Sequence, residues 1–197
     1  MLQLNESELA EVLTTDIPEK FKITIVVVNS HRNMEWISEA VFSAQNQKTS
    51  VEIEYVIIDN PNGRWSISEA FNRGVQKAKT EYVLLLSDDD KLHNTAVDLL
   101  VRVALWAKTH RPEVYRVACK SLLIEETGEM ICKSNIVCMG MFKKEVLDTF
   151  GGFPDVPWWH YSTTHLVNPE QLFDLQVDGY NTIIIEPTLY FMRLHNG

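Results

Sequence analysis

The sequence predicts an α/β fold in which a mostly parallel β-sheet is flanked by helices and is followed by a half with mixed strand directions. Three observations support this prediction. The chain has 197 residues, of which 45% are hydrophobic, so one domain with a substantial core is expected. Its first half alternates apolar, β-branched runs with segments of helical period. The connections between these segments are short, as in β-α-β units with right-handed crossovers.

The first half contains three predicted strands, and each is followed by a predicted helix. Apolar residues dominate every strand, which is typical of strands that are covered on both faces. The clearest helix follows Ser66, because Ser66 and Glu69 have the spacing of a capping box and apolar residues then keep helical period for three turns. The predicted strands span residues 21–28, 51–58 and 81–86, and the predicted helices span 34–46, 66–78 and about 94–108.

The second half is less regular, and turn signals divide it. A turn is expected at Thr127–Gly128, and Gly151–Pro154 ends a helical segment. An aromatic loop over residues 154–164 follows. The predicted strands span 114–119, 121–125, 130–136, 182–186 and 188–194, and the predicted helices span 143–150 and 169–177.

Residues 1–20 are acidic and polar, and they form a predicted N-terminal arm. Asn5 and Glu8 have the spacing of a capping box, so this arm holds either a short helix or a loose chain. No linker long enough to separate two domains is visible in the rest of the chain. The expected single domain spans 21–197, with a first half over about 21–110 and a second half over about 111–197.

The charge balance narrows the classes of partner. Lys plus Arg number 18 against 27 Asp plus Glu, which gives a formal net charge of −9. This balance argues against a nucleic-acid-binding protein and against a polybasic membrane anchor. A ligand that carries phosphate would need a cation, or a local patch of backbone N–H groups and arginines, to bind such a chain.

Three features favour a cytoplasmic protein. The three cysteines form no CxxC pair, which favours buried thiols in a reducing compartment. The first twenty residues lack the basic and apolar regions of a signal peptide. The longest apolar runs are far too short to cross a bilayer, so no transmembrane segment is expected.

A polar segment follows each of the three predicted parallel strands. These segments cover residues 29–32, 59–64 and 87–90. Ligands of doubly wound sheets bind outside the carboxyl ends of the strands, so the three segments are expected to line one crevice. No GxGxxG follows the first strand and the chain has no GxxxxGK[ST], which argues against a dinucleotide cofactor and a P-loop.

The stretch Ser87-Asp88-Asp89-Asp90 is the most informative one. Adjacent carboxylates repel one another, so a strand end keeps such a cluster when a cation neutralises it. Mg²⁺ and Mn²⁺ bind one or two carboxylates and complete their coordination with water and substrate phosphates. The alternative is a solvated acidic turn in which Asp90 caps the next helix. At the end of the third strand of such a sheet we favour the metal site, with Asp88, Asp89 and Asp90 as candidate ligands.

Asp59 closes the second strand and is a candidate for binding a nucleoside. A carboxylate at this place can accept hydrogen bonds from a ribose or from a base edge. The alternative is an Asx-turn, because turn-forming residues follow it. Asn29, His31 and Arg64 lie at the same strand ends and are expected to face the nucleoside, and Asp88 is a further candidate for contact with the nucleotide.

From about Ile23 to His195, the order of these parts resembles the family 2 glycosyltransferases, which have the Rossmann-like GT-A fold. The family has an opening strand with a polar tip, a strand that ends in a nucleoside-binding Asp, and a helix and strand that lead into a DXD motif. A Gly-Gly-Phe segment and a late strand with a histidine follow. The corresponding stretches here are Ile23–Arg32, Tyr55–Asn60, Phe71–Asp90, Met141–Phe153 and Arg193–His195.

The resemblance implies a sugar-nucleotide donor, usually a UDP-sugar, and a divalent cation (Mn²⁺ or Mg²⁺) at the DXD motif. It also implies His195 as a metal ligand, and direct displacement at the anomeric carbon. The usual first Asp of the motif falls on Ser87, so two registers stay open. Either Asp88 and Asp89 act, with Asp89 on the metal, or the motif reads Asp88-Asp89-Asp90. The first half then binds the nucleotide and the second half binds the acceptor.

The displacement needs a base, because the acceptor hydroxyl loses its proton as it attacks. Family members commonly carry an acid at the start of the helix that precedes a Gly-Tyr pair. Gly179–Tyr180 is present here. In the stretch 166–173 before it, Glu170 is the acid nearest to the start of the predicted helix, although Asn168 can occupy the strict position. Glu170 is therefore the predicted catalytic base. The alternatives are Asp155, His160 and His165.

The sequence thus predicts a metal-dependent, inverting glycosyltransferase that moves a sugar to the hydroxyl of a glycan, a lipid-linked or a protein acceptor. Trp158 and Trp159 are candidates for stacking on the acceptor, and the alternative is a hydrophobic loop that packs on the sheet. Two other functions stay open. One is a sugar-nucleotide-binding module without catalysis, and the other is a nucleotidyltransferase, although the basic Gly-rich loop expected of the latter is missing.

Overall fold

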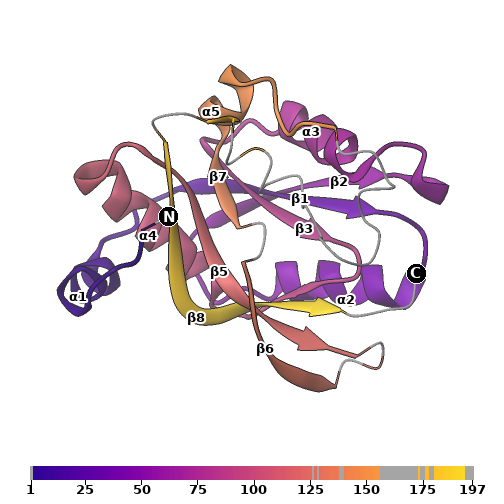
Figure 1. Ribbon diagram of the computed structural model, residues 1–197, viewed down its shortest axis with the longest axis horizontal. Helices are drawn as coiled ribbons and strands as arrows, with labels where there is room; N and C mark the ends of the chain where they lie inside the picture. The colour runs from indigo at the N-terminus through magenta and orange to yellow at the C-terminus, as the bar shows by residue number, and fades with distance from the viewer. Residues whose placement is uncertain are drawn as a thin grey trace.

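The computed structural model is built around one mixed β-sheet with helices on both faces (Figure 1). It describes residues 2–125, 127, 129–137, 140–155, 173, 176–177 and 180–193. The strands are β1 (Lys22–Asn29), β2 (Glu52–Asp59), β3 (Tyr82–Ser87), β4 (Lys91–Leu92), β5 (Val114–Ile124), β6 (Met130–Val137), β7 (Met141–Lys143) and β8 (Asn181–Arg193). The helices are α1 (Glu6–Thr14), α2 (Met34–Gln45), the 3₁₀ turn η1 (Pro61–Gly63), α3 (Ile67–Lys77), α4 (Ala96–His110) and α5 (Lys144–Thr149). In the part of the chain described, no helix combines the length and the apolar character needed to cross a membrane.

The strand order is β2-β1-β3-β7-β5-β8-β4, and β6 pairs with β5. β1 is parallel to both of its neighbours, so that Val26 lies beside Val56 on one side and beside Leu85 on the other. β7 is antiparallel to β3 and to β5 and thereby joins the two halves of the sheet. β8 is parallel to β5 and antiparallel to the short strand β4. The predicted fold class is confirmed, with a parallel first half and a mixed second half.

The strands of the second half are longer than the sequence predicts. Two pairs of predicted strands each form one continuous strand, β5 and β8. The register between them shifts where Lys120 of β5 opposes Glu186–Leu189 of β8. Pro187 lies in this irregularity, where its missing N–H interrupts no regular ladder. The strand therefore continues past a proline at which a sequence pattern predicts a break.

The N-terminal arm takes its helical alternative. The side chains of Asn5 and Glu8 form the reciprocal bonds of a capping box at the start of α1. α1 packs against α4 with Val12 fully buried, and Trp106 Nε1 of α4 donates a hydrogen bond to Glu11 at 2.9 Å. The arm thus lies against the sheet's helical layer rather than apart from it.

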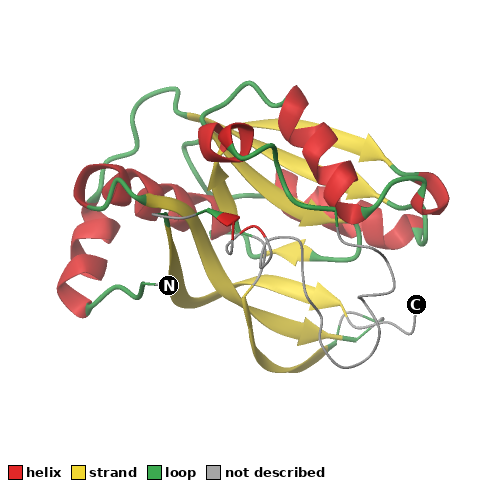
Figure 2. Cartoon of the chain, turned by 45° about the horizontal axis from the view of Figure 1, so that its top comes forward, coloured by secondary structure: helices red, strands yellow, loops and turns green. Residues whose placement is uncertain are grey.

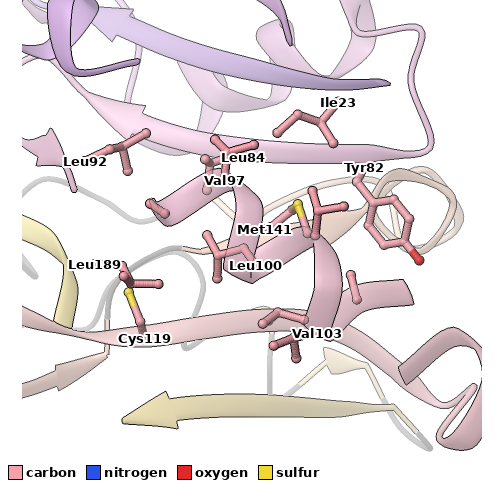
Figure 3. Close-up of a cluster of buried hydrophobic side chains, with 14 of the residues drawn as sticks. Ile23, Tyr82, Leu84, Leu92, Val97, Leu100, Val103, Cys119, Met141 and Leu189 are labelled. Carbon is pink, nitrogen blue, oxygen red and sulfur yellow. The ribbon is translucent and has the colours of Figure 1, made fainter. Parts of the chain in front are cut away.

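The sheet separates two layers of buried side chains, with helices on either side (Figure 2). Ile25 of β1 faces the layer of α1, α2 and α4, whereas its neighbour Val26 faces the layer of α3 and α5. Figure 3 shows part of the first layer, where Leu84 of β3 and Met141 of β7 lie against Leu100 of α4. Because both faces of β1 and β3 are covered, both sets of alternating residues in these strands are mostly apolar, whereas the edge strand β2 is largely exposed and carries Glu52 and Glu54.

The side chain of Asn72 ties α3 to the Gly-Gly-Phe segment that follows α5. It donates to the carbonyl oxygen of Phe153 and accepts from the N–H of Phe153, both at 2.8 Å. Gly152 has a φ of +85°, and a Cβ at this position would lie 2.4 Å from Asn72 Oδ1. A glycine at 152 is therefore needed both for its backbone conformation and for the room that it leaves to the amide.

Candidate functional site

The carboxyl ends of β1, β2 and β3 meet at one edge of the sheet, as the parallel topology requires (Figure 1). Asn29 and Asp59, the last residues of β1 and β2, are register partners. On the other side of β1, Val28 pairs with Ser87, the last residue of β3. The three polar segments predicted to line one crevice therefore start next to one another.

Asn29, His31 and Asp59 form a hydrogen-bonded group at this edge. Asn29 Nδ2 donates to Asp59 Oδ1 at 3.1 Å, and His31 Nε2 lies 3.2 Å from the same oxygen. The amide oxygen of Asn29 accepts from the N–H of His31 at 3.0 Å, which stabilises a left-handed backbone at His31 with a φ of 61°. The Asp59 side chain is still 70% exposed. Its carboxylate is therefore oriented by protein groups while remaining accessible to a ligand.

The turn after β2 is closed by Asn60 rather than by Asp59. The buried Asn60 side chain donates to the carbonyl oxygen of Trp65 at 2.9 Å and accepts from the N–H of Trp65 at 2.8 Å. The guanidinium of Arg64 lies 5.1 Å from the centroid of the Trp65 ring. Beside this turn is a cavity of about 380 Å³ whose lining includes Asp59, Trp65 and Arg73. Asp59 thus lies on the wall of this cavity.

In the acidic loop, residues 87–90, Asp88 is bound to the segment after β1. Ser30 donates both its N–H and its hydroxyl to Asp88 Oδ2, each at 2.6 Å. The Asp88 side chain is buried. These bonds fix the end of β3 to the end of β1, so the position of the acidic loop relative to Asn29 is set by the protein itself.

Asp90 is also buried, and it faces β8. Its Oδ1 accepts a hydrogen bond from the backbone N–H of Arg193 at 3.1 Å. Burial, together with the neighbouring charge of Asp89, raises the pKa of the Asp90 carboxyl well above its usual range. The N-cap of α4 is Thr95, so the alternative in which Asp90 caps the next helix is wrong. With Asp88 and Asp90 both buried, the loop is not a solvated turn.

Asp89, the remaining carboxylate of the acidic loop, is half-buried. Mg²⁺ and Mn²⁺ commonly take one or two carboxylates together with water and substrate phosphates. Among the described residues, no group of three His, Cys, Asp or Glu side chains is placed to hold a metal ion.

Several predicted site residues lie outside the described part of the chain. Asp155, one alternative base, is described and is exposed. Six others lie outside it. They are the predicted base Glu170, the alternative bases His160 and His165, the candidates for acceptor contact Trp158 and Trp159, and the predicted metal ligand His195.

Two residues of the site carry no sequence prediction of their own. Ser30 lies in the polar segment after β1, and Asp88 directly follows the neighbouring strand β3. A hydroxyl and a carboxylate at adjacent strand ends are a signal that could have predicted their hydrogen bond. Arg193 enters the sequence argument only as part of the late Arg-Leu-His stretch. Its bond to Asp90 joins residues 103 positions apart, and no local pattern marks such a contact.

No protein family model matches the sequence, and no curated protein matches it. The fold is nevertheless similar to that of S. aureus TarS. The crystal structure of TarS 1-349 in complex with UDP-GlcNAc has a TM-score of 0.59 at 16% identity, over 90% of this chain and 59% of that chain. The complex with UDP has a TM-score of 0.57 at 15% identity, over 89% of this chain and 60% of that chain.

A third structure, of S. aureus TarS itself, has a TM-score of 0.53 at 15% identity, over 89% of this chain and 37% of that chain. This chain thus spans between 37% and 60% of the length of these TarS structures. The similarity supports the fold class, a mixed α/β sheet flanked by helices.

Proposed function

We propose that this chain is a glycosyltransferase that uses a nucleoside diphosphate sugar, a UDP-sugar, as its donor. The observation that carries the proposal is the convergence of Asn29, Asp59 and the acidic loop at the carboxyl ends of three parallel strands. Ligands of doubly wound sheets bind at this place. The fold that the chain shares with TarS, whose structures include complexes with UDP and UDP-GlcNAc, supports the same donor class.

The nucleoside would bind beside Asp59. An exposed carboxylate that is held in place by Asn29 and His31 can accept hydrogen bonds from a ribose hydroxyl or a base N–H without first becoming ordered. The Arg64 guanidinium lies against the ring of Trp65, which lines the same cavity. This arrangement supports the assignment of Asn29, His31, Asp59 and Arg64 to the nucleoside.

The diphosphate would lie near the acidic loop, where Asp89 would hold a divalent cation, Mn²⁺ or Mg²⁺, together with the donor phosphates. Asp88 and Asp90 are the further candidate ligands within the loop, and His195 is the candidate outside it. When bound, the cation would neutralise the charge that develops on the leaving nucleoside diphosphate. A chain with a net charge of −9 otherwise repels a diphosphate, which supports metal dependence.

The transfer step would be a direct displacement that inverts the anomeric centre. The acceptor oxygen forms a bond to the anomeric carbon as the nucleoside diphosphate leaves, and Glu170 would take the acceptor's proton. Trp158 and Trp159 would present apolar ring faces to the acceptor. The acceptor is proposed only as a hydroxyl compound, whether a glycan, a lipid-linked or a protein acceptor.

Thermal unfolding with nucleotides tests the donor class, because a ligand that binds the folded chain must raise its midpoint. UDP and UDP-GlcNAc should raise the midpoint when Mn²⁺ is present and should raise it much less with a chelator. GDP, CDP and ADP are the matched controls for the base. If no nucleoside diphosphate raises the midpoint under either condition, the proposal fails.

Product analysis tests whether the chain catalyses a reaction. A glycosyltransferase should release free UDP from a UDP-sugar, slowly by hydrolysis and faster once an acceptor is supplied. Donor binding without release of UDP across a panel of UDP-sugars and hydroxyl acceptors would favour the binding module. Release of pyrophosphate from a nucleoside triphosphate and a sugar phosphate would favour the nucleotidyltransferase.

A further inference from the structure

Arg193, at the carboxyl end of β8, is a buried cation beside the acidic loop. Only 1% of its side chain is exposed. Its Nε donates to the carbonyl oxygen of Asp89 at 3.1 Å, and its backbone N–H donates to Asp90 Oδ1 at 3.1 Å. One residue of the last described strand thus holds two consecutive members of the loop, the first through its main chain and the second through its carboxylate.

Other elements fix the rest of the guanidinium. Its Nη2 bonds the carboxylate of Glu39 on α2, and its Nη1 lies 3.4 Å from the carbonyl oxygen of Glu125, just after β5. The guanidinium carbon lies 5.1 Å from the centroid of the Trp36 ring. The donors of an arginine form a rigid planar fork, so partners on α2, just after β5 and in the loop together define one position for the group.

Stability alone is a poor explanation for an arginine at this place. The desolvation of a buried ion pair can outweigh the attraction between its charges, and apolar replacements of such pairs are often as stable. Glu39, the carboxylate that bonds Arg193, is shared with Lys91, whose Nζ lies 3.1 Å away. Lys91 directly follows the acidic loop. Arg193, Glu39 and Lys91 therefore form a network on the β4 side of the loop. Ser30 binds the loop on its β1 side.

We propose that Arg193 is a positioning residue for donor binding, which holds the main chain at Asp89 so that its carboxylate meets the donor diphosphate and its cation. This inference rests on the proposed function. Asp89 is flanked by two anchored residues, since Ser30 binds Asp88 and Arg193 binds Asp90. An Arg193→Lys substitution keeps the positive charge but removes the fork, so a lysine cannot bond Glu39 and the Asp89 carbonyl in the same geometry.

Arg102 offers a matched control for this substitution. Its Nε bonds Asp98 at 2.8 Å and its Nη1 bonds the carbonyl oxygen of Thr15, so it also joins a carboxylate to a main-chain carbonyl, but on α4. We expect Arg193→Lys to weaken Mn²⁺-dependent UDP binding by about tenfold or more, the effect of losing a charge-assisted hydrogen bond. Arg102→Lys should bind UDP as the parent chain does, and calorimetric titration measures both.

Amide hydrogen exchange separates this inference from the proposed function, because it needs no ligand. Arg193→Lys should speed exchange in residues 87–91 and leave α4 unchanged, whereas Arg102→Lys should leave residues 87–91 unchanged. If the parent chain does not bind UDP, the proposed function is contradicted, while faster exchange in residues 87–91 still supports the positioning role.

Unaltered UDP binding together with unaltered exchange in residues 87–91 of a folded Arg193→Lys variant overturns the inference. If that variant does not fold, Glu39→Gln takes its place, because Glu39 orients the guanidinium from a partly exposed position. Glu39→Gln should weaken UDP binding by about threefold, the scale of a partly exposed ion pair. Parent-like UDP binding together with parent-like exchange in Glu39→Gln would then contradict the positioning role of Arg193.

Discussion

Ser30 donates its N–H and its hydroxyl to one oxygen of Asp88, and both bonds measure 2.6 Å. This relationship distinguishes the three carboxylates of the acidic loop. Asp88 is held by Ser30, Asp90 is held by the N–H of Arg193, and Asp89 lies between them with its side chain half-buried. Substitutions in the loop should therefore have different effects, according to whether they remove an anchored carboxylate or the proposed metal ligand.

Asp89→Ala should abolish metal-dependent UDP binding and leave the fold intact, because it relieves repulsion between like charges. Asp88→Ala should instead lower the free energy of unfolding by about 1–3 kcal/mol, since the partly buried donors of Ser30 lose their partner. Urea unfolding and calorimetric titration with UDP and Mn²⁺ separate the two effects. Parent-like donor binding in Asp89→Ala would remove Asp89 from the metal site.

Asp59→Ala should weaken donor binding by about 1–3 kcal/mol, the usual cost of leaving a hydrogen-bonding partner unpaired. Binding of Mn²⁺ in the absence of donor should change little, because Asp59 lies at the end of β2 rather than in the acidic loop. Glu54→Ala, which removes an exposed carboxylate from the same strand, is the control. Equal donor affinities for Asp59→Ala and Glu54→Ala would argue against the nucleoside assignment.

Glu170→Gln tests the proposed base, since it keeps the size of the side chain and removes the charge. Transfer should fall by about 10²–10⁴-fold, the typical contribution of a general base. Donor affinity should hardly change, because the proton belongs to the acceptor. The opposite result is near-normal transfer in Glu170→Gln with a large loss in Asp155→Asn or His165→Ala, which would assign the base to one of those residues.

Gly152→Ala and Gly151→Ala test the Gly-Gly-Phe segment as a matched pair. Both glycines have a φ in the left-handed region, +85° and +79°, but a Cβ at 151 meets nothing within 4 Å. Gly151→Ala should therefore cost only the conformational strain, about 1–2 kcal/mol. Gly152→Ala should cost about 1–3 kcal/mol more, because it displaces the Asn72 amide from Phe153. Equal losses in urea unfolding would show that the Asn72 contact contributes little.

Glu39 should give the chain a pH-dependent component of stability. Burial opposes its ionisation, but the hydrogen bonds and charges of Lys91 and Arg193 lower the pKa of Glu39 below its ordinary value of 4.5. A carboxyl with a lowered pKa stabilises the fold above that ordinary value and loses this effect as the pH falls through the folded-state pKa.

The parent chain should therefore exceed Glu39→Gln in unfolding free energy near neutral pH, by about 1 kcal/mol or less for a partly exposed pair. The difference should shrink as the pH falls well below 4.5. Glu54→Gln, at an exposed position on β2, serves as the control for loss of one negative charge. If the difference in unfolding free energy between the parent chain and Glu39→Gln stays constant with pH, the ion pairs of Glu39 are not its cause.

The first half of the fold could be predicted because its signals are local. The apolar runs of β1 and β3 and the caps at Asn5 and Ser66 need only a few neighbouring residues to be recognised. The strand ends then follow from topology, since parallel strands must bring their carboxyl ends to one edge. That reasoning alone brings Asn29 beside Asp59 and the start of the acidic loop beside β1.

The second half resisted prediction because its determinants are distant in sequence. Pro187 predicts a strand break. The strand continues because β8 pairs there with the irregular part of β5. The two-residue strand β4 has no pattern of its own and exists through its pairing with β8. The anchoring of Asp88 and Asp90 depends on contacts of the same kind, so the sequence indicated the acidic cluster without indicating which of its carboxylates are anchored.

The contact between Asp90 and Arg193 bears on how the molecule assembles. β1, β2 and β3 lie close in sequence and can pair early, because their connections are short and cost little loop-closure entropy. The acidic loop instead receives its last contacts from β8, 103 residues further along the chain. Folding should therefore pass through species in which the parallel strands are in register while the edge of the sheet that carries the acidic loop is still unformed. Nucleotide affinity is then a late reporter of folding, and it should recover after the far-ultraviolet signal in a refolding experiment.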